Sequence, residues 1–245
     1  MSEMTSEREP LRLVLVSAGT GNPSSTRLLG DRVAQKTLDL LREADAPATV
    51  NVIELGPLAV DIARATVSGI VSTDLQAAIE RLAAADGVIA ATPVYKAGIS
   101  GLFKSFVDLL DNDLLVAKPI LLAATAGSAR HALVVDEQMR PLFAYMRALS
   151  LPTSVFATPE DWAAGELGER IERAAGELST LLRAGVGREI ADRNWSAHQH
   201  EFGGNATRAD RTAADVDFDS DLMRLATGGT LNRAVGAQVL GDGSA

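Results

Sequence analysis

The sequence predicts an α/β protein in which helices cover both faces of a five-stranded parallel sheet, forming a three-layer sandwich. Five short apolar runs alternate with segments whose apolar residues recur at helical spacing. Aromatic residues make up only 4% of the chain and hydrophobic residues 47%, which suits helices packed closely on a buried sheet. Five such units favour the strand order 2-1-3-4-5 over a six-stranded dinucleotide-binding sheet.

The strands are predicted where a short apolar run ends in turn-forming residues. The first run, LRLVLV, leads directly into a loop of serine, glycine and threonine. Pro93 is expected to end the third strand, because proline has no N–H group for the sheet. The predicted strands are 11–16, 48–55, 86–92, 119–125 and 154–157.

The helices are predicted where leucine, valine and isoleucine recur every three or four residues. Pro141 either breaks the long pattern 131–149 or divides it into two helices. The segment 56–72 is expected to be a looser connection. The predicted helices are 24–42, 73–85, 102–110, 131–149 and 166–184.

The chain divides into three parts by composition. Residues 1–10 are polar and are expected to be a flexible N-terminus, and residues 11–184 form the α/β domain. Residues 185–245 are richer in polar residues and glycine, with apolar residues spread thinly. We expect this C-terminal extension to be partly helical or disordered and to be a candidate for packing on a partner subunit.

The composition excludes several classes of function. A net charge of -9 disfavours binding to nucleic acid, and the absence of cysteine removes disulfides and thiolate chemistry. The apolar runs are too short to span a membrane, and the N-terminus lacks the apolar core of a secretory signal, so a cytoplasmic location is expected. His198 and His200 are two residues apart and do not share a helix face, which argues against a metal site.

The first candidate loop, SAGTGNPSSTR, follows the first strand and enters a helix. Backbone N–H groups at a helix start, together with several hydroxyls, can bind a phosphate group. Gly19 and Gly21 lack the third glycine of a dinucleotide-binding loop, and no Walker motif is present, so a terminal monophosphate is favoured. The alternative is that Ser24 or Ser25 only caps the helix.

Two further loops follow the third and fourth strands. In TPVYKAGISG, Tyr95 offers an aromatic face and Lys96 a cation, although a simple turn with a solvated lysine would explain both. In TAGSARH, successive small residues expose backbone amides that can bind a ring edge and favour negative charge. His131, at the start of the predicted helix, is more often structural than catalytic in such a position.

Together the three loops resemble the NADPH-dependent FMN reductase family, which has a flavodoxin-like fold. The motifs are VSAGTGNPSSTRLL, ATPVYKAGISGLFKSFVDLL and ATAGSARHALVVDEQMRPLFAYMRAL, within residues 11–162. The last two are similar to the branch that supplies reduced flavin to alkanesulfonate monooxygenases. The whole chain is more similar to an actinobacterial branch that partners luciferase-like monooxygenases. The alkanesulfonate-related branch has an aromatic residue where this chain has Ile99. This difference bears on ring stacking and on quaternary switching in this chain.

The resemblance implies FMN and NADPH or NADH as cofactors, hydride transfer between them, and release of reduced FMN to a separate monooxygenase. It implies a homodimer or homotetramer, with helices 102–110 and 132–149 as candidate interfaces. It implies neither a catalytic side chain nor a metal. The open alternatives are a flavin-retaining quinone or azo-compound reductase, a flavodoxin-type electron carrier, and a non-catalytic dinucleotide-binding module. The implied cofactor-binding residues are Ser17, Ser24, Ser25, Thr26, Pro93, Val94, Tyr95, Lys96, Gly98, Thr125, Ala126, Gly127 and Ser128.

Overall fold

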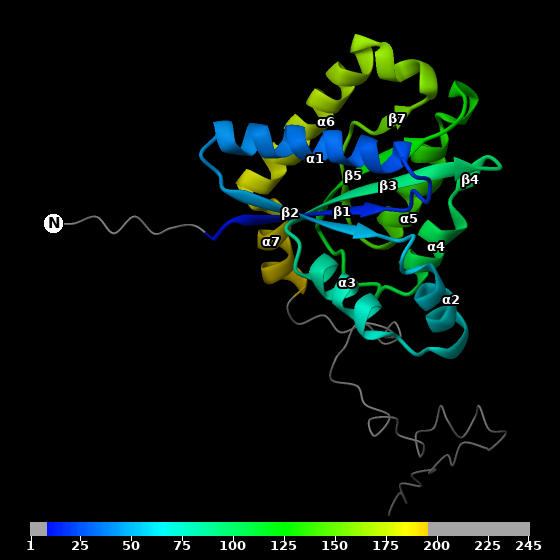
Figure 1. Ribbon diagram of the computed structural model, residues 1–245. Coiled ribbons are helices and arrows are strands. Elements are labelled where there is room, and N and C mark those ends of the chain that lie inside the picture. The colour runs from blue at the N-terminus through cyan, green and yellow to red at the C-terminus, as the bar shows by residue number, and fades with distance from the viewer. Residues whose placement is uncertain (1–8, 196–245) are drawn as a thin grey trace, which may run out of the picture. The chain divides into compact units, whose positions relative to one another are not determined.

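The computed structural model describes residues 9–195 and shows a parallel sheet with helices on both faces (Figure 1). The sheet order is β2-β1-β3-β5, and both β6 and β7 pair with β5, so the predicted order of the five main strands is confirmed. Two short strands, β4 and β6, were not predicted. The strands are β1 Leu11–Ser17, β2 Ala48–Glu54, β3 Gly87–Tyr95, β4 Gly98–Ile99, β5 Pro119–Thr125, β6 Leu149–Ser150 and β7 Val155–Ala157.

Alternate residues of the central strands pack into two separate hydrophobic cores, one on each face of the sheet. Leu13 and Leu15 of β1 pack with helices α1 and α6 on one face. Val14 and Val16 pack with α3 and α4 on the other face. This alternation explains why the strand sequences are almost continuously apolar. The α-helices are α1 Ser25–Glu43, α2 Ala59–Ser68, α3 Thr73–Ala83, α4 Gly101–Asp108, α5 Arg140–Tyr145, α6 Gly165–Ala184 and α7 Val186–Ile190.

The strand prediction was wrong at Pro93, because β3 continues through it to Tyr95. The Ala18 N–H donates to the Ala91 carbonyl, so alternate residues of β3 turn their backbone groups toward β1. β1 ends at Ser17, opposite Ala91. Pro93 lies two residues farther along, where β1 no longer offers an acceptor, and its missing N–H therefore costs nothing.

The helix predictions were wrong in two places. The supposed loose connection contains α2, whose Ile62 and Ala65 are buried. The predicted helix 131–149 is instead a 3₁₀ turn, η1 (Ala129–His131), a π-helix, η2 (Val135–Met139), and α5. Pro141 stands in the first turn of α5, where a proline needs no hydrogen-bond acceptor.

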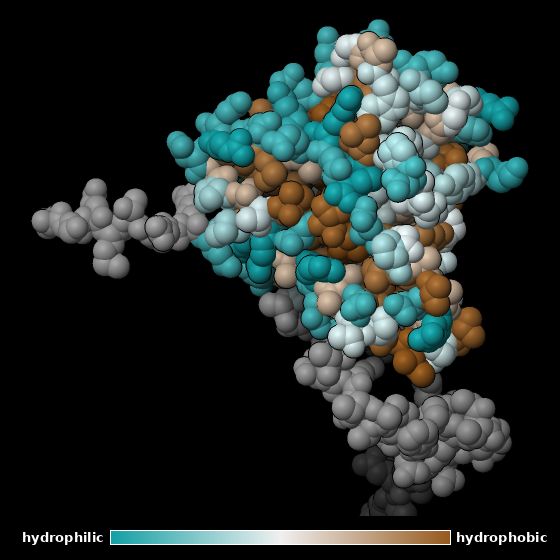
Figure 2. Space-filling model, in the orientation of Figure 1, coloured by the Kyte–Doolittle hydropathy of each residue, from teal (hydrophilic) through white to brown (hydrophobic). Residues whose placement is uncertain are grey.

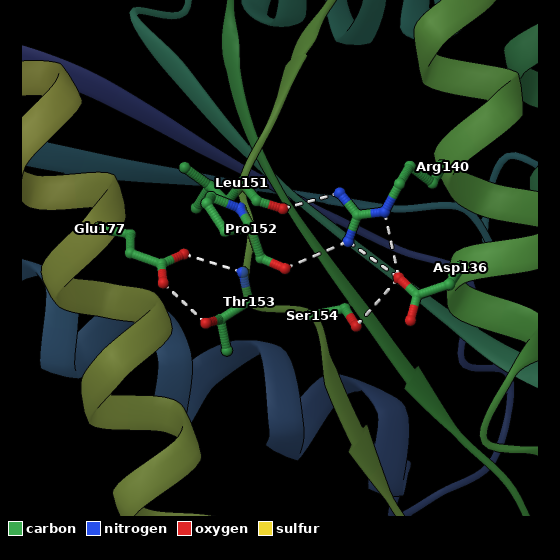
Figure 3. A network of polar contacts seen from close by, with 7 residues as sticks. All are labelled: Asp136, Arg140, Leu151, Pro152, Thr153, Ser154 and Glu177. Carbon is green, nitrogen blue, oxygen red and sulfur yellow. Dashed lines mark hydrogen bonds and ion pairs between the residues drawn. The ribbon is translucent and has the colours of Figure 1, made fainter.

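A polar network fixes the segment between β6 and β7 (Figure 3). From one side, Arg140 donates to the Leu151 carbonyl at 2.8 Å and pairs with Asp136 at 2.8 Å. From the other side, the Glu177 carboxylate accepts from the N–H and the hydroxyl of Thr153, at 2.9 and 2.7 Å. Because β7 pairs with the end of β5, this network supports the loop that follows β5.

The chain after α6 continues as α7 and a second π-helix, η4 (Ala191–Trp195). Arg188 bonds Asp86 at 2.6 Å, and Arg147 lies 5.2 Å over the Trp195 ring, so this segment packs on the same body. The remainder of the predicted extension, with His198 and His200, lies outside the described residues. Within 9–195 no helix combines the length and the apolar character that crossing a membrane would require.

Candidate functional site

The three predicted loops leave the sheet at its carboxyl edge, from neighbouring strands. Ser17 of β1 lies opposite Ala91 of β3, and Pro93 of β3 lies opposite Thr125 of β5. The first and third loops also touch directly, because the hydroxyls of Thr26 and Thr125 are 2.6 Å apart and hydrogen-bonded. The structure therefore brings all three loops to one place, where open α/β sheets bind their ligands.

The first loop is wound tightly onto the start of α1. A Cβ atom at Gly19 would lie 1.9 Å from Ser24 Oγ and 3.0 Å from Thr26 Cβ, so a side chain there would displace the Ser24 hydroxyl from its capping position. Ser24 is the N-cap of α1 and its Oγ accepts from the Arg27 N–H at 3.2 Å. The N–H groups of Ser25 and Thr26 precede any acceptor within the helix, and the first turn contains no acidic residue. This helix start is suited to an anion.

The four hydroxyl residues of this loop have different surroundings. Ser24 is half-buried and Ser25 is exposed, so both are reachable from solvent. Ser17 is buried and its Oγ lies 3.4 Å from the Gly19 N–H. Thr26 is also buried, and its hydroxyl is engaged with Thr125.

Arg27, one turn into α1, is held by two carboxylates. Its Nε lies 2.8 Å from Asp31, and its Nη1 lies 2.6 Å from Glu54 at the end of β2. The hydrogen bond to Asp31 is the largest of the effects that raise the pKa of Arg27. Its guanidinium is therefore neutralised by the protein itself.

The second loop is a two-residue β-hairpin that extends β3 (Figure 1). Tyr95 pairs with Gly98, and Val94 with Ile99. The turn residues are Lys96 and Ala97, with φ of 51° and 61°. Positive φ at both positions is the turn geometry that matches strand twist, but it costs a non-glycine residue about 1 kcal/mol. The turn thus carries a lysine at a position where glycine would adopt the backbone conformation without this cost.

Gln138 of η2 clamps this hairpin, and no pattern in the sequence marks this residue. Its Oε1 accepts from the Ile99 N–H at 3.1 Å, and its Nε2 donates to the Ala97 carbonyl at 3.0 Å. Among the described strands β4 pairs only with β3, so the amide replaces the partner that a further strand would supply. The π-helix places this side chain against the loop, as π-helices often do at functional sites.

The third loop combines one engaged amide with two that are open. The Ala126 N–H donates to the Ala157 carbonyl at 3.1 Å, so this amide is not available to a ligand. Within the described residues no hydrogen bond engages the N–H groups of Gly127 and Ser128. A Cβ atom at Gly127 would meet nothing within 4 Å, which leaves room for a flat ring. His131 follows, and its Nε2 accepts from Arg130 Nε at 3.3 Å.

Two hollows lie at opposite edges of the sheet. The one at the carboxyl edge, of about 700 Å³, is lined by Val94, Tyr95, Lys96, Ala97, Arg130 and His131. The other, of about 880 Å³, lies at the amino edge and includes Lys118. Lys118 Nζ donates to the carbonyls of Ala83 and Ala85 at the end of α3, at 2.8 and 2.6 Å. We place the candidate site at the carboxyl edge, because at the amino edge Lys118 is already engaged in closing the C-terminal end of α3.

No side-chain set in the described part of the chain suggests acid–base or metal chemistry. Across 9–195 no cluster of three or more histidine, aspartate or glutamate residues could hold a metal ion. The arrangement consists instead of a helix start for an anion, an aromatic ring at Tyr95 and open amides at Gly127 and Ser128. This arrangement is suited to a flat, phosphate-bearing molecule.

Comparison with known proteins gives consistent results. The profile of a family described as NADPH-dependent FMN reductase matches residues 11–163. The chain is 40% identical over 156 residues to NADH-dependent FMN reductase SfnF of Pseudomonas fluorescens, covering 63% of this chain and 80% of that protein. It is 37% identical over 153 residues to FMN reductase (NADPH) of Pseudomonas aeruginosa, covering 62% and 80%. An oxidoreductase from Corynebacterium diphtheriae superposes with a TM-score of 0.70 at 43% identity, covering 71% of this chain and 98% of that structure.

Proposed function

The chain belongs to the NADPH-dependent FMN reductase family, and we propose that its carboxyl-edge loops hold FMN for reduction by a nicotinamide nucleotide. The observation that carries this assignment is the contact between Gly19 and the start of α1. This close approach keeps the loop that carries Ser17, Ser24 and Ser25 at the start of α1, whose first turn contains no acidic residue. A terminal phosphate suits this position better than a bridging diphosphate, for which a third glycine would be needed.

The other two loops supply the surroundings of the flavin ring. Pro93, Val94, Tyr95 and Gly98 form the hairpin side, and Tyr95 is 54% exposed, so its ring is free to contact a second ring. Thr125, Ala126, Gly127 and Ser128 form the opposite side, where the open amides of Gly127 and Ser128 are available to the ring edge. Amides in this position stabilise negative charge that develops on a bound ring. Thr26 acts through Thr125 by joining the two loops.

When bound, FMN supplies a ring whose N5 accepts a hydride from C4 of the nicotinamide. The part of the protein is to hold both rings in contact, which requires no acid or base. The enzyme is therefore an NAD(P)H-dependent FMN oxidoreductase that works by positioning.

We propose further that reduced FMN is released to a separate luciferase-like monooxygenase in the cytoplasm. The support is the similarity of the whole chain to the branch that partners such monooxygenases, together with the exposure of Tyr95 and Gly127 in the site. A coupled assay with such a monooxygenase, with and without a trap for free reduced flavin, tests release. Product formation that a trap does not diminish would contradict free diffusion of the flavin.

We also propose a homodimer or homotetramer. Leu133 and Tyr145, in one of the two predicted interface segments, are 64% and 67% exposed, which favours that segment. The other, α4, buries Phe103, Phe106 and Val107 within its own chain. Hydrophobic residues also gather over α2 (Figure 2). Deleting the residues after Trp195 and measuring the oligomeric mass tests the share of the C-terminal extension.

The phosphate site can be tested by FMN binding without turnover. Ser25→Asp places a carboxylate at the first position of α1, where it stabilises the helix but repels a phosphate. Thr73→Asp is the matched control, because Thr73 follows the N-cap Ser72 at the same position of α3. We expect Ser25→Asp to weaken FMN binding, followed by flavin fluorescence, at least about tenfold. Equal FMN affinity of the two variants would refute the assignment.

A further inference from the structure

Three cations are near the carboxyl-edge site, and the structure separates them. Arg27 is neutralised by Asp31 and Glu54, with contacts of 2.8 and 2.6 Å. A phosphate at Arg27 would face these two carboxylates at short range, which is unfavourable. Arg27 is therefore not a binding group for a further phosphate.

Lys96 and Arg130 have the opposite surroundings. Both line the hollow of about 700 Å³, and none of its other lining residues is a carboxylate. In the described part of the chain neither side chain forms an ion pair, although the protein carries a net charge of -9. Two cations without a counter-ion, in one hollow of an acidic protein, attract an anion.

The contacts around both residues leave their charged groups available to a ligand. Gln138 bonds the hairpin at the turn residue Ala97 and at Ile99 of β4, and so fixes the backbone next to Lys96. Arg130 Nε donates to His131 Nε2 at 3.3 Å, which leaves its two terminal nitrogens free to bind. A guanidinium anchored through Nε presents a planar pair of donors, which matches a phosphate.

We propose that Lys96 and Arg130 bind a phosphate group of the nicotinamide nucleotide. This assignment rests on the proposed FMN reductase function and adds the recognition of the second substrate. It places the FMN phosphate at the start of α1 and the nucleotide phosphate in the hollow between the hairpin and η1. The preference between NADPH and NADH then depends on whether the 2′-phosphate or the diphosphate reaches these two cations.

The test uses Arg130→Gln, Lys96→Gln and the double variant of the full chain. Arg173→Gln is the control for each single variant, because Arg173 is exposed on α6 and forms no ion pair in the described part of the chain, and its replacement changes the net charge by the same one unit. Binding of adenosine 2′,5′-bisphosphate and of ADP to flavin-free protein is measured by calorimetry. FMN affinity is measured by fluorescence, and KM is measured for NADPH and for NADH.

We expect the double variant to raise KM for NADPH by about tenfold or more, with FMN affinity unchanged. If adenosine 2′,5′-bisphosphate binding falls while ADP binding and KM for NADH are unchanged, the site holds the 2′-phosphate. If the binding of both probes falls and KM rises for both nucleotides, it holds the diphosphate. Weakened FMN binding with nucleotide binding unchanged would assign the cations to the flavin phosphate and overturn the proposal. Nucleotide binding by the double variant equal to that of Arg173→Gln would also overturn the proposal. If the wild type did not bind FMN at all, the proposed function itself would be refuted.

Discussion

Replacing Thr26 or Thr125 with valine removes one hydroxyl from a hydrogen bond that joins two loops of the site. The two oxygens are 2.6 Å apart, and the residues are 2% and 6% exposed. Valine has the shape of threonine, so neither replacement opens a cavity. The hydroxyl that remains is buried without a partner, and we expect each single variant to lose about 1–3 kcal/mol of unfolding free energy. The double variant leaves no unpaired hydroxyl and is expected to lose less than the sum of the two.

The assay is a double-mutant cycle by urea unfolding, with FMN affinity measured on the same four proteins. We expect a coupling of about 1 kcal/mol or more between the two sites. Thr37→Val is the control for loss of a buried threonine hydroxyl, because Thr37 Oγ1 only back-bonds to the Val33 carbonyl within α1. Additive effects of the two replacements would refute the reasoning that this bond joins the loops.

Three further predictions concern residues around the sheet. Burial lowers the pKa of Lys118 to about 8 from 10.5, so the unfolded chain binds more protons between these values and stability rises with pH there. Relative to Lys118→Met, the unfolding free energy of the wild type, measured with urea, should rise by up to about 3 kcal/mol between pH 8 and 10.5. Parallel pH profiles of the two proteins would contradict this. Ala97→Gly relieves a positive φ of 61° and should raise the unfolding free energy by about 0.5–1 kcal/mol. An unfolding free energy equal to that of the wild type would mean that the turn is unstrained. Gly187→Ala brings a Cβ within 2.5 Å of the Ala117 carbonyl and should lower the melting temperature by an amount equivalent to about 1–3 kcal/mol, whereas an unchanged temperature would mean that α7 does not pack as described.

The sequence predicted the sheet order and the three loops because these features depend on local patterns. Apolar runs that end in small residues mark buried strands, and neighbouring parallel strands end at one edge. The limits of β3 could not be predicted, since Pro93 is tolerated only because β1 ends beside it. That fact belongs to the register between strands and not to either strand alone.

The missed parts of the site depend on contacts between distant residues. Gln138 lies 39 residues from Ile99, and nothing in its own neighbourhood marks it as a clamp. Thr26 has the sequence context of a phosphate ligand, yet its hydroxyl bonds Thr125, 99 residues away. Helix α2 was missed because its N-cap is Leu58, which makes no side-chain cap hydrogen bond, so the sequence carries no start signal for it. Such features follow from the assembled fold and from no local rule.

The proposed FMN reductase activity is best tested by following NADPH and NADH oxidation by purified, flavin-free protein while FMN is titrated. We predict little oxidation without FMN and a rate that rises and saturates as free FMN is added, because the flavin is bound, reduced and released. Tight binding of FMN with no oxidation of either nucleotide would contradict the account, and the protein would then be an electron carrier.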